Sequence, residues 1–375
     1  MEEAQKEKAR RVLAVMPAAH GAMGGIPQLC CDVLDSLSKH PEVSSIDVLC
    51  RRSPDSQPLD APKSVHYLSQ GSYSLQAFLM AALGLSLRRV RYDAIIVAHI
   101  NLLLVAALFS PRGRVPIVLM IHGIEVWNPS RLWLLKLLLN KVSLVLGVSR
   151  CTINRFLPWA GPHLNEIPCE VLPCAIDLER FTPGAKPDEL ISKYELRDKK
   201  VLLTLCRLDP AERYKGIDEV LEVLPELSKR YPNIAYLIAG TGEDRDRLEK
   251  KAVDLEIDER VIFLGYVEEE FKVELYRLAD VFVMPGSGEG FGIVYLEAVA
   301  CGIPAIGSVL DGSYEALLEG ELGECVDPNY PDQLLEAIDK QLGDSSREVP
   351  SAITTFSIEA HARRLHQYLN MVFKS

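Results

Sequence analysis

Short apolar runs rich in β-branched residues alternate with longer helical patterns along this chain, and the alternation occurs twice. The first series consists of RVLAVM (11–16), SIDVLC (45–50), DAIIVA (93–98), VPIVLMI (115–121) and VSLVLGV (142–148). The second consists of KVLLTLC (200–206), IAYLIAG (234–240), RVIFLG (260–265), VFVMPG (281–286) and IPAIG (303–307). Such alternation predicts parallel sheets that helices cover on both faces. The expected fold class is therefore α/β, with two doubly wound domains.

Two domains also suit the length, because 375 residues exceed the size of one ordinary hydrophobic core. The helical patterns lie near residues 26–39, 74–91, 101–109, 130–140, 216–230, 243–256, 269–279, 291–301 and 357–373. A segment rich in proline and turn residues, 173–189, joins the two series. We predict an N-terminal domain of residues 1–180 and a C-terminal domain of residues 181–355. A last helix within 356–375 is expected to pack back on the N-terminal domain.

Charge is distributed unevenly between the two halves. Residues through Lys186 contain 20 Lys and Arg against 15 Asp and Glu, and the remainder contains 21 against 37, so +5 and −16 give the net −11. The acidic half argues against nucleic acid as the main partner. The basic half permits an anionic or membrane-associated partner. Simple solvation of surface helices explains the acidic charge equally well.

The composition is that of a protein without membrane spans. No segment reaches the roughly 20 uninterrupted apolar residues that a transmembrane helix needs. The first eleven residues, MEEAQKEKARR, are too polar for a secretory signal. Nine cysteines occur without a C-x-x-C pair or a zinc spacing, so reduced thiols in a cytoplasmic protein are expected.

The loop after the first predicted strand is rich in glycine. Ligands of open parallel sheets bind outside the carboxyl ends of the strands, so such loops matter most. In PAAHGAMGGIPQ (17–28), Gly24 and Gly25 permit close backbone approach to an anion at a helix N-terminus. The loop matches neither G-x-G-x-x-G nor a Walker loop, which disfavours a nicotinamide dehydrogenase. A plain tight turn is the alternative.

Two loops of the second half place charged residues beside a predicted phosphate site. In CRLDPAERYKG (206–216), Arg207 and Lys215 can hold a diphosphate, although such cations taken alone are more often surface residues. In PGSGEGFGIVYLEAVACG (285–302), Glu289 stands in a glycine-rich turn and Glu297 follows about two helical turns later. Each carboxylate can accept hydrogen bonds from sugar hydroxyls. The helix start between them offers free backbone N–H groups to a phosphate.

With these motifs in place, residues 200–330 resemble the retaining GT-B glycosyltransferases of family four, whose C-terminal domain is called glycosyltransferase group 1. The resemblance rests on the order and spacing of CRLDPAERYKG, IAGTGEDRDRLEKKA, VIFLGYV, LADVFVMPGSGEGFGIVYLEAVACGIPAIG and GELGECVDP. The N-terminal half resembles the family more loosely, through GGIPQ, HGIEVW and GVSR. The resemblance implies the GT-B fold, with two Rossmann-like domains that face a central cleft.

The resemblance also implies roles for individual residues. Arg207 and Lys215 would hold the donor diphosphate, and Glu297 the ribose hydroxyls. Glu289 would contact the donor sugar, and His122 would lie beside the reacting sugar. The implied catalytic residues are His122, Glu289, Arg207 and Lys215. The implied donor-binding residues are Gly24, Gly25, Arg207, Lys215, Gly265, Tyr266, Val267, Glu289, Gly290, Phe291, Gly292, Ile293 and Glu297.

Near predicted strand ends of the first half, His99, Asn101 and Glu125 are expected to bind the acceptor. A lone histidine such as His122 is more often structural, so its role depends on the resemblance. The sequence D-R-D at 244–246 looks like a metal-binding pair, but a solvated helix face is the favoured interpretation. We therefore expect no catalytic metal and no cofactor. The two cations and the helix start would supply the stabilising positive charge.

Two features leave a choice open. The family often has P-S-x-x-E-G-F-G, whereas Gly286, Ser287 and Gly288 stand here, so the loop before Glu289 is expected to have more freedom and the donor sugar stays undetermined. The apolar segment RLWLLKLLLNK (131–141) is either a core helix, which is favoured, or an interfacial helix that holds the enzyme against a membrane bearing a lipid-linked acceptor.

The sequence thus predicts a cytoplasmic, metal-independent, retaining glycosyltransferase, peripheral on the inner face of the membrane if the interfacial interpretation holds. It would move a hexosyl group from a UDP-sugar or GDP-mannose to a glycan, lipid-linked or small-molecule acceptor. A slight likeness of GFGIVYLEA to mannosyltransferases that act on lipid acceptors favours GDP-mannose. The alternatives are a nucleotide-sugar epimerase on the same fold and a non-catalytic nucleotide-sugar-binding protein.

Overall fold

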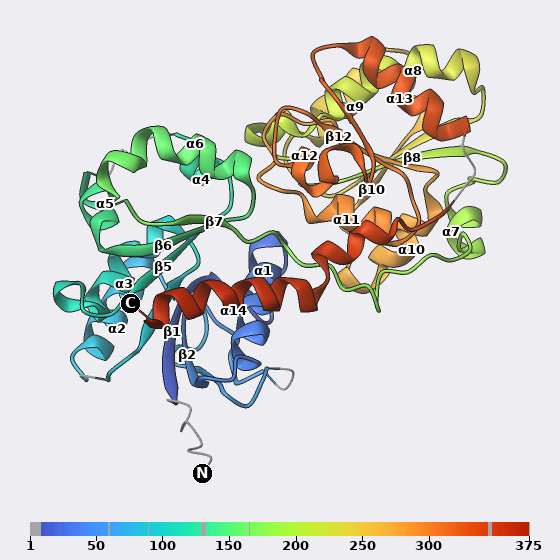
Figure 1. Cartoon of the computed structure of the whole chain (residues 1–375). Coiled ribbons are helices and arrows are strands. Elements are labelled where there is room, and N and C mark those ends of the chain that lie inside the picture. The colour runs from blue at the N-terminus through green and yellow to red at the C-terminus, as the bar shows by residue number, and fades with distance from the viewer. Residues whose placement is uncertain are drawn as a thin grey trace. The chain divides into compact units, whose positions relative to one another are not determined.

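The computed structural model of the protein describes residues 9–58, 61–88, 90–128, 133–164, 166–343 and 347–374. The chain divides into two compact units, and the divisions fall after Ala175 and after Ser357. Unit 1 holds the first 175 residues and the last helix, and unit 2 holds residues 176–357. Each unit is an open parallel sheet with helices on both faces (Figure 1), as the alternating sequence pattern predicts. Residues 1–8 of the polar N-terminal segment lie outside the described residues.

The sheet of unit 1 has seven parallel strands in the order β3-β2-β1-β4-β5-β6-β7. They are β1 (Arg10–Ala18), β2 (Val43–Arg52), β3 (Val65–Tyr67), β4 (Ala94–Val97), β5 (Ile117–Ile121), β6 (Val142–Gly147) and β7 (Cys169–Val171). Every residue of β4 and β5 is buried, as expected for central strands covered on both faces. The strand order reverses between β1 and β4, so ligands are expected at the carboxyl ends of these two strands.

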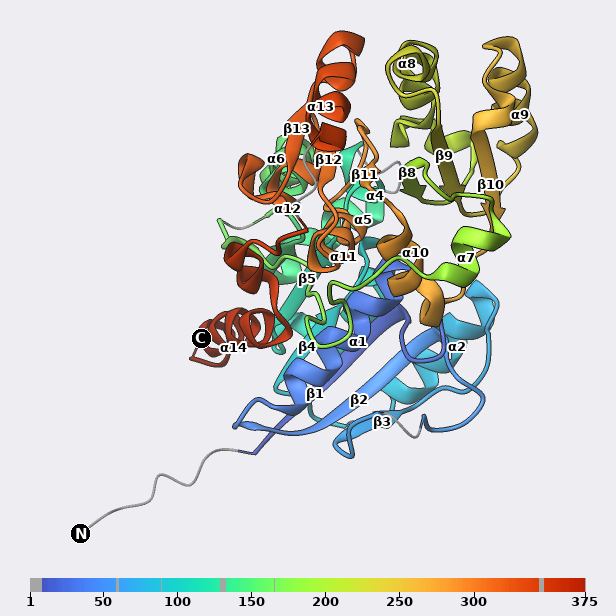
Figure 2. The same ribbon diagram turned by 90° about the vertical axis from the view of Figure 1, so that its right-hand side faces the viewer.

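The helices of unit 1 form two layers. They are α1 (Gly25–Ser38), α2 (Leu75–Ser86), α3 (Leu103–Phe109), α4 (Ile124–Trp127), α5 (Trp133–Leu138), α6 (Arg150–Ala160) and α14 (Ile358–Lys374), with short 3-10 helices at Ile100–Leu102, Pro111–Gly113, Leu139–Lys141 and Gly161–His163. The last helix, α14, runs alongside α1 (Figure 1), and α1 lies against β1 and β2 (Figure 2). The other face packs α2, α3, α5 and α6 on one apolar cluster that contains Phe78 and Phe156.

The sheet of unit 2 has six parallel strands in the order β10-β9-β8-β11-β12-β13. They are β8 (Lys200–Leu205), β9 (Ile234–Ala239), β10 (Val261–Gly265), β11 (Val281–Val283), β12 (Ala305–Ser308) and β13 (Glu324–Val326). The order reverses between β8 and β11. The loops after these two strands therefore border the position where open sheets bind ligands.

Helices cover both faces of this second sheet (Figure 2). They are α7 (Asp188–Lys193), α8 (Ile217–Arg230), α9 (Arg245–Asp254), α10 (Lys272–Leu278), α11 (Ile293–Ala300), α12 (Ser313–Ala316) and α13 (Pro331–Gly343), with 3-10 helices η5 (Pro210–Lys215), Asp258–Arg260, Glu269–Phe271, Leu318–Gly320 and Ser351–Phe356. Helix α8 shows why the local sequence folds this way. Its first turn carries Asp218 and Glu219 and its last turn Lys229 and Arg230, which complements the helix dipole.

All ten predicted strands are present, with ends shifted by a few residues. Three strands were not predicted, namely β3, β7 and β13, each of which is only three residues long. The helix predicted near 74–91 ends at Ser86, and the one near 130–140 is the shorter α5 followed by a 3-10 turn. No helix in the described part of the chain is both long and apolar enough to cross a bilayer.

A buried histidine in α14 makes the stability of unit 1 depend on pH. His361 is 1% exposed, its Nδ1–H donates to the carbonyl oxygen of Pro173 at 2.8 Å, and its Nε2 has no partner among the described residues. Burial lowers the pKa of His361 from 6.5 to about 4, and the bond to Pro173 opposes this shift only in part. The folded state therefore prefers the neutral ring.

We expect wild-type stability to fall relative to His361→Gln as the pH drops from 7.5 to 5. The unfolded chain takes up a proton below its pKa of 6.5, whereas the folded chain resists until about 4, so stability is lost inside this window. At pH 5 the loss amounts to about 2 kcal/mol. Urea unfolding of both proteins at the two pH values measures it, because the comparison cancels the titration of other groups. Parallel pH profiles would contradict the expectation.

Candidate active site

The loops after β8 and β11 bring together the residues that are predicted to bind the diphosphate and the sugar. Arg207 follows β8, Lys215 ends η5, and Glu289 lies in the loop after β11. The Nζ of Lys215 donates to Oε2 of Glu289 at 2.8 Å, across 74 positions of sequence. Their side chains are only 14% and 21% exposed. The structure thus brings together, as one charged pair, two residues that the sequence could only assign to the loops after two predicted strands.

Glu212 is a member of this cluster that the sequence analysis missed. Its carboxylate accepts from Nη2 of Arg207 and lies 4.0 Å from Nζ of Lys215. Burial would lower the pKa of Lys215, but attraction by Glu289 outweighs it, so the pKa is raised and the ammonium stays charged. The guanidinium side chain of Arg207 is 75% exposed. One cation is therefore fixed by two carboxylates while the other remains accessible to an anion.

Asp311, in the loop after β12, holds the backbone of Glu289. Its Oδ2 accepts from the N–H of Glu289 at 2.8 Å, and the N–H of Gly312 donates to the carbonyl oxygen of Glu289 at 2.8 Å. Asp311 is 2% exposed, and burial raises its pKa although bonds from Ser313 oppose the shift. The sequence analysis missed this residue too. Its position four residues after the end of a predicted strand, IPAIG, was the available signal.

The start of helix α11 lies where the sequence predicts it, directly after the glycine-rich loop, and its binding of an anion stays a prediction. Gly292 has a φ of 89°, which favours glycine, and Ile293 is the first helical residue. The ring of Phe291 packs on Phe356 at 5.5 Å and is 3% exposed, so it anchors this turn in the core. Gly290 approaches Gly312 closely, since a Cβ on Gly312 would lie 2.0 Å from the Gly290 carbonyl oxygen.

Glu297 lies inside unit 2, on α11, with protein partners for both carboxylate oxygens. The hydroxyl of Tyr276 donates to Oε2 at 2.6 Å, and Nζ of Lys272 lies 3.3 Å from Oε1. Glu297 is 3% exposed and Tyr276 is fully buried. The predicted ribose contact of Glu297 stays a prediction, and the observed contacts give the residue a packing role besides.

The predicted base-lining residues lie at the same sheet edge, two strands away from β8. Gly265 ends β10 with a φ of 74°, and its carbonyl oxygen accepts from the N–H of Gly240 at 2.8 Å. Tyr266, the next residue, is 53% exposed, and Val267 follows it. Their contact with a base stays a prediction.

In unit 1, the predicted acceptor residues and His122 gather at the carboxyl ends of β4 and β5. The ring centroids of His99 and His122 are 6.4 Å apart. The N–H of Asn101 donates to Nδ1 of His99, and Oε1 of Glu125 accepts from the backbone N–H of His122. Burial lowers the pKa of His99, with Glu125 opposing and His122 adding to the shift. These four residues, two from the segment after β4 and two from the segment after β5, form one polar cluster.

The tautomer of His122 follows from its contacts. Its Nε2 lies 2.6 Å from the carbonyl oxygen of Ala98, which can only accept, so Nε2 carries the proton. Its Nδ1 is buried without a partner among the described residues. In the neutral ring this nitrogen carries the lone pair, which can accept a hydrogen bond from a hydroxyl group.

The glycine pair after β1 lies at the strand reversal of unit 1. Gly24 has a φ of 114° and precedes α1, and no atom would lie within 4 Å of a Cβ on Gly25. Both glycines are exposed. His20, in the same loop, was not predicted; it is 7% exposed and its Nδ1 lies 2.8 Å from the hydroxyl of Tyr67.

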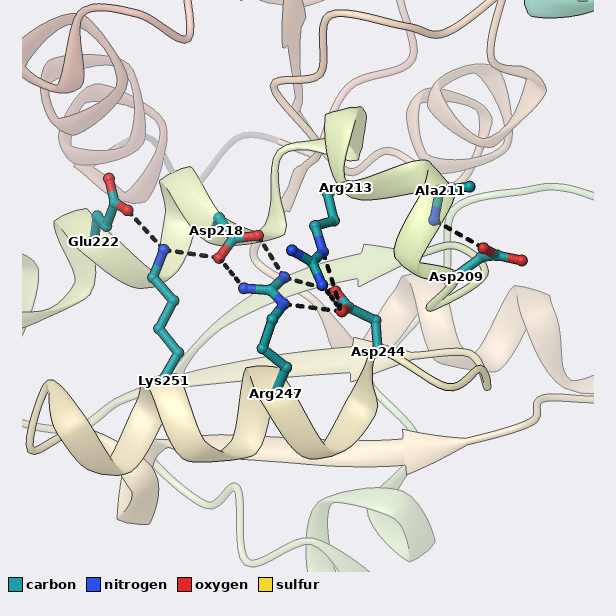
Figure 3. A network of polar contacts seen from close by, with 8 residues as sticks. All are labelled: Asp209, Ala211, Arg213, Asp218, Glu222, Asp244, Arg247 and Lys251. Carbon is teal, nitrogen blue, oxygen red and sulfur yellow. Dashed lines mark hydrogen bonds and ion pairs between the residues drawn. The ribbon is translucent and has the colours of Figure 1, made fainter.

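The interpretation of the D-R-D sequence as part of a solvated helix face is wrong for Asp244. Asp246 is exposed, but Asp244 is 4% exposed and accepts bonds from Arg213 and Arg247 (Figure 3). Arg247 also forms two bonds of 2.7 Å to Asp218. The carboxylate therefore belongs to an ion-pair network that ties η5 to α8 and α9. The described residues contain no group of three or more His, Cys, Asp or Glu side chains able to hold a metal ion.

The apolar segment 131–141 is only partly core, against the favoured interpretation. Leu135, Leu138 and Leu139 are buried in the cluster of unit 1, at 8% exposure or less. Trp133 and Leu137, in contrast, are 69% and 53% exposed. The first two residues of the segment lie outside the described residues.

Comparisons with known proteins agree with this architecture. A family model described as Glycosyltransferase Family 4 matches residues 23–180, and one described as Glycosyl transferases group 1 matches residues 187–354. The structure of Anabaena HepE in complex with UDP and glucose matches with a TM-score of 0.73 at 19% identity, over 96% of this chain and 99% of that chain. Sucrose-phosphate synthase from Thermosynechococcus elongatus matches with a TM-score of 0.73 at 20% identity, over 97% and 99%.

Among curated relatives, a GDP-mannose-dependent alpha-(1-6)-phosphatidylinositol monomannoside mannosyltransferase of Mycolicibacterium smegmatis is 36% identical over 259 residues. A monoacylated-acceptor counterpart from Corynebacterium glutamicum is 31% identical. Each alignment spans 66% of this chain and 66% of the relative, just under two thirds of its length. The chain belongs to the family-four glycosyltransferases, and its two α/β units are those of the GT-B fold.

Proposed function

We propose that the protein transfers mannose from GDP-mannose to a lipid-linked acceptor. The observation that carries the proposal is the cluster of Arg207, Lys215 and Glu289 at the carboxyl ends of β8 and β11, beside the start of α11. It occurs in a chain 36% identical to a mannosyltransferase named for GDP-mannose and a phosphatidylinositol mannoside. UDP-sugars remain the second class of donor, since the structure of HepE contains UDP.

Unit 2 binds the donor in this proposal. The exposed guanidinium of Arg207 and the ammonium of Lys215 neutralise the diphosphate, and the N–H groups at the start of α11 add hydrogen bonds to it. Glu289 accepts from hydroxyls of the sugar, and Glu297 from those of the ribose. The backbone of residues 265–267 lines the base.

Unit 1 binds the acceptor, through the cluster of His99, His122, Asn101 and Glu125. The free lone pair on Nδ1 of His122 suits a sugar hydroxyl. The transfer is proposed to retain the configuration of the sugar by same-face attack. The bond from the anomeric carbon to the leaving phosphate breaks, the acceptor oxygen takes its place, and a phosphate oxygen takes up the acceptor's proton. Glu289 stabilises the positive charge that develops on the sugar rather than forming a covalent bond to it.

The proposed reaction needs no metal ion or cofactor. The charge that a metal would supply to the leaving diphosphate comes from the two cations and the helix start. The carboxylate that most resembled a metal ligand in the sequence, Asp244, is occupied by two arginines.

An apolar surface of unit 1 supports a lipid-linked acceptor. Helices α2 and α5 both pack on α3, and both expose large apolar side chains. These include Met80, Leu83, Trp133, Leu134 and Leu137, with Leu87 just beyond α2. Arg88 and Arg91 are exposed beside them, which suits anionic lipid headgroups. The protein is therefore proposed to act in the cytoplasm as a peripheral protein on the inner face of the membrane.

The test combines ligand binding with turnover. Melting temperatures are measured with UDP, GDP, ADP, UDP-glucose and GDP-mannose, each with and without EDTA; a ligand that binds the folded state raises the melting temperature. Transfer from GDP-mannose to phosphatidylinositol monomannoside in vesicles is then measured by mass spectrometry. A GDP-specific shift that EDTA leaves unchanged, together with a product heavier by one hexose, is expected. Conversion of the donor sugar without an acceptor would support the epimerase instead, and binding without turnover a nucleotide-sugar-binding protein.

A further inference from the structure

The glycines before Glu289 do not loosen the loop, contrary to the expectation from the sequence. Neither Gly286 nor Gly288 has a left-handed φ, so their backbone conformation does not call for glycine. Both positions require glycine because neighbouring atoms leave no space for a side chain. A Cβ on Gly286 would lie 2.6 Å from the carbonyl oxygen of Tyr214, and one on Gly288 would lie 2.3 Å from Cδ2 of the Tyr214 ring. Atoms cannot approach so closely without displacement.

Tyr214 is thus the residue on which the glycine-rich loop 285–288 packs. Its carbonyl oxygen accepts from the N–H of Ser287 at 2.8 Å. On the same side, a Cβ on Gly216 would lie 2.6 Å from the carbonyl oxygen of Pro285. The segments 214–216 and 285–288 therefore lie flat against each other, with a glycine wherever the backbones come closest.

This contact sets the relative position of two residues that are predicted to bind the donor. Lys215 directly follows Tyr214, and Glu289 directly follows Gly288. Their side chains meet at 2.8 Å, and the ammonium of Lys215 lies 5.7 Å from the centre of the Tyr214 ring. On its other side, Glu289 is held through both backbone groups by Asp311 and Gly312. Glu289 is thus held by the Tyr214 segment on one side and by the loop after β12 on the other.

We infer that Tyr214 is a positioning residue for the donor-sugar site, and that Gly288 is the partner that makes room for its ring. The inference rests on the proposed function for the role of Glu289. It assigns a cause to the glycine at position 288, because the ring of Tyr214 occupies the volume that a side chain there would take. Ring carbons make the contact, so the hydroxyl is not what positions the loop.

The test is a mutant cycle measured as GDP release from GDP-mannose. Gly288→Ala is expected to lower kcat/KM on the order of 10²-fold, since shifts near 1 Å at a reacting centre cost that much. Tyr214→Ala lowers it by about 10-fold because the loop loses its support, and the double variant Gly288→Ala with Tyr214→Ala recovers at least about 10-fold over Gly288→Ala alone. Tyr214→Phe stays within about 2-fold of wild type because the ring remains.

The controls separate positioning from general damage. Tyr330→Ala removes an aromatic ring that is 57% exposed in the same unit, and it should leave kcat/KM unchanged. The affinity for GDP, which lacks the sugar that Glu289 contacts, should change by less than about 3-fold in all variants. A double variant no better than Gly288→Ala, or a Tyr214→Phe variant as poor as Tyr214→Ala, would overturn the inference.

A stability measurement made without any donor tests the inference independently of the proposed function. In urea unfolding, the two single substitutions should be strongly non-additive, since the added methyl group fits once the ring is gone. Additive losses of stability would overturn the matched contact whatever the donor is. If Gly288→Ala fails to fold, Tyr214→Leu takes its place: full kcat/KM in that variant contradicts positioning by the ring. If the wild-type protein releases no GDP from GDP-mannose, the proposed donor is wrong. The unfolding measurements on the single and double variants still test the contact between Tyr214 and Gly288.

Discussion

Replacing Lys215 with alanine is expected to lower kcat/KM for GDP-mannose by about 10²–10³-fold, the usual cost of losing one preorganised group that stabilises developing charge. The ammonium lies 2.8 Å from Glu289 and 4.0 Å from Glu212, and it is largely buried. Its loss removes the cation proposed to face the diphosphate. It also leaves two carboxylates without their shared partner, and these would repel an incoming phosphate.

Donor kinetics and the GDP-induced shift of melting temperature measure this effect. Lys229→Ala is the matched control, because Lys229 lies in the same unit, is 72% exposed and pairs only with Glu226 among the described residues. Exposed pairs of this kind contribute little, so the control should behave as wild type. Adding Glu212→Gln to Lys215→Ala should restore part of the affinity for GDP by removing one repelling charge. A Lys215→Ala protein that binds GDP and turns over as wild type would refute the proposed donor site.

The parts of the fold that the sequence predicted are those encoded by local patterns. Buried parallel strands such as β4 and β5 are continuous apolar runs, and a run of this kind precedes each of the loops that hold Arg207, Glu289 and His122. The three-residue strands β3, β7 and β13 carry too few residues to show a pattern. Their pairing comes from the neighbouring strand in the sheet, which is a tertiary contact.

Two of the residues missing from the sequence prediction, Asp311 and Tyr214, act through partners distant in the chain, whereas the partners of Glu212 are local. Asp311 accepts from the backbone of a residue 22 positions away, and the ring of Tyr214 meets a glycine in another loop. Glycine in a turn suggests freedom when it is considered alone. Only the structure shows that the neighbouring loop fills the space, and so reverses that interpretation for Gly288.

The second large expected effect is a loss of stability of unit 2 when the buried carboxylate of Glu297 on α11 is removed. Glu297→Ala is expected to lower the free energy of unfolding of unit 2 by about 2–3 kcal/mol, somewhat below the range for breaking a buried pair. The hydroxyl of Tyr276, fully buried, loses its acceptor at 2.6 Å. Lys272 keeps a second partner, Glu269 at 2.9 Å, and this limits the loss.

Glu297→Gln separates the packing role of this residue from the proposed ribose contact. The amide oxygen can still accept from Tyr276, so the loss of stability should shrink to about 1 kcal/mol. GDP titration by calorimetry should nevertheless show an affinity lowered by about 10-fold, because an amide is a weaker acceptor for ribose hydroxyls than a carboxylate. Glu274→Ala, an exposed residue of the neighbouring α10, should change neither quantity. Wild-type affinity for GDP in Glu297→Gln would leave the carboxylate with its packing role alone and would refute the ribose contact.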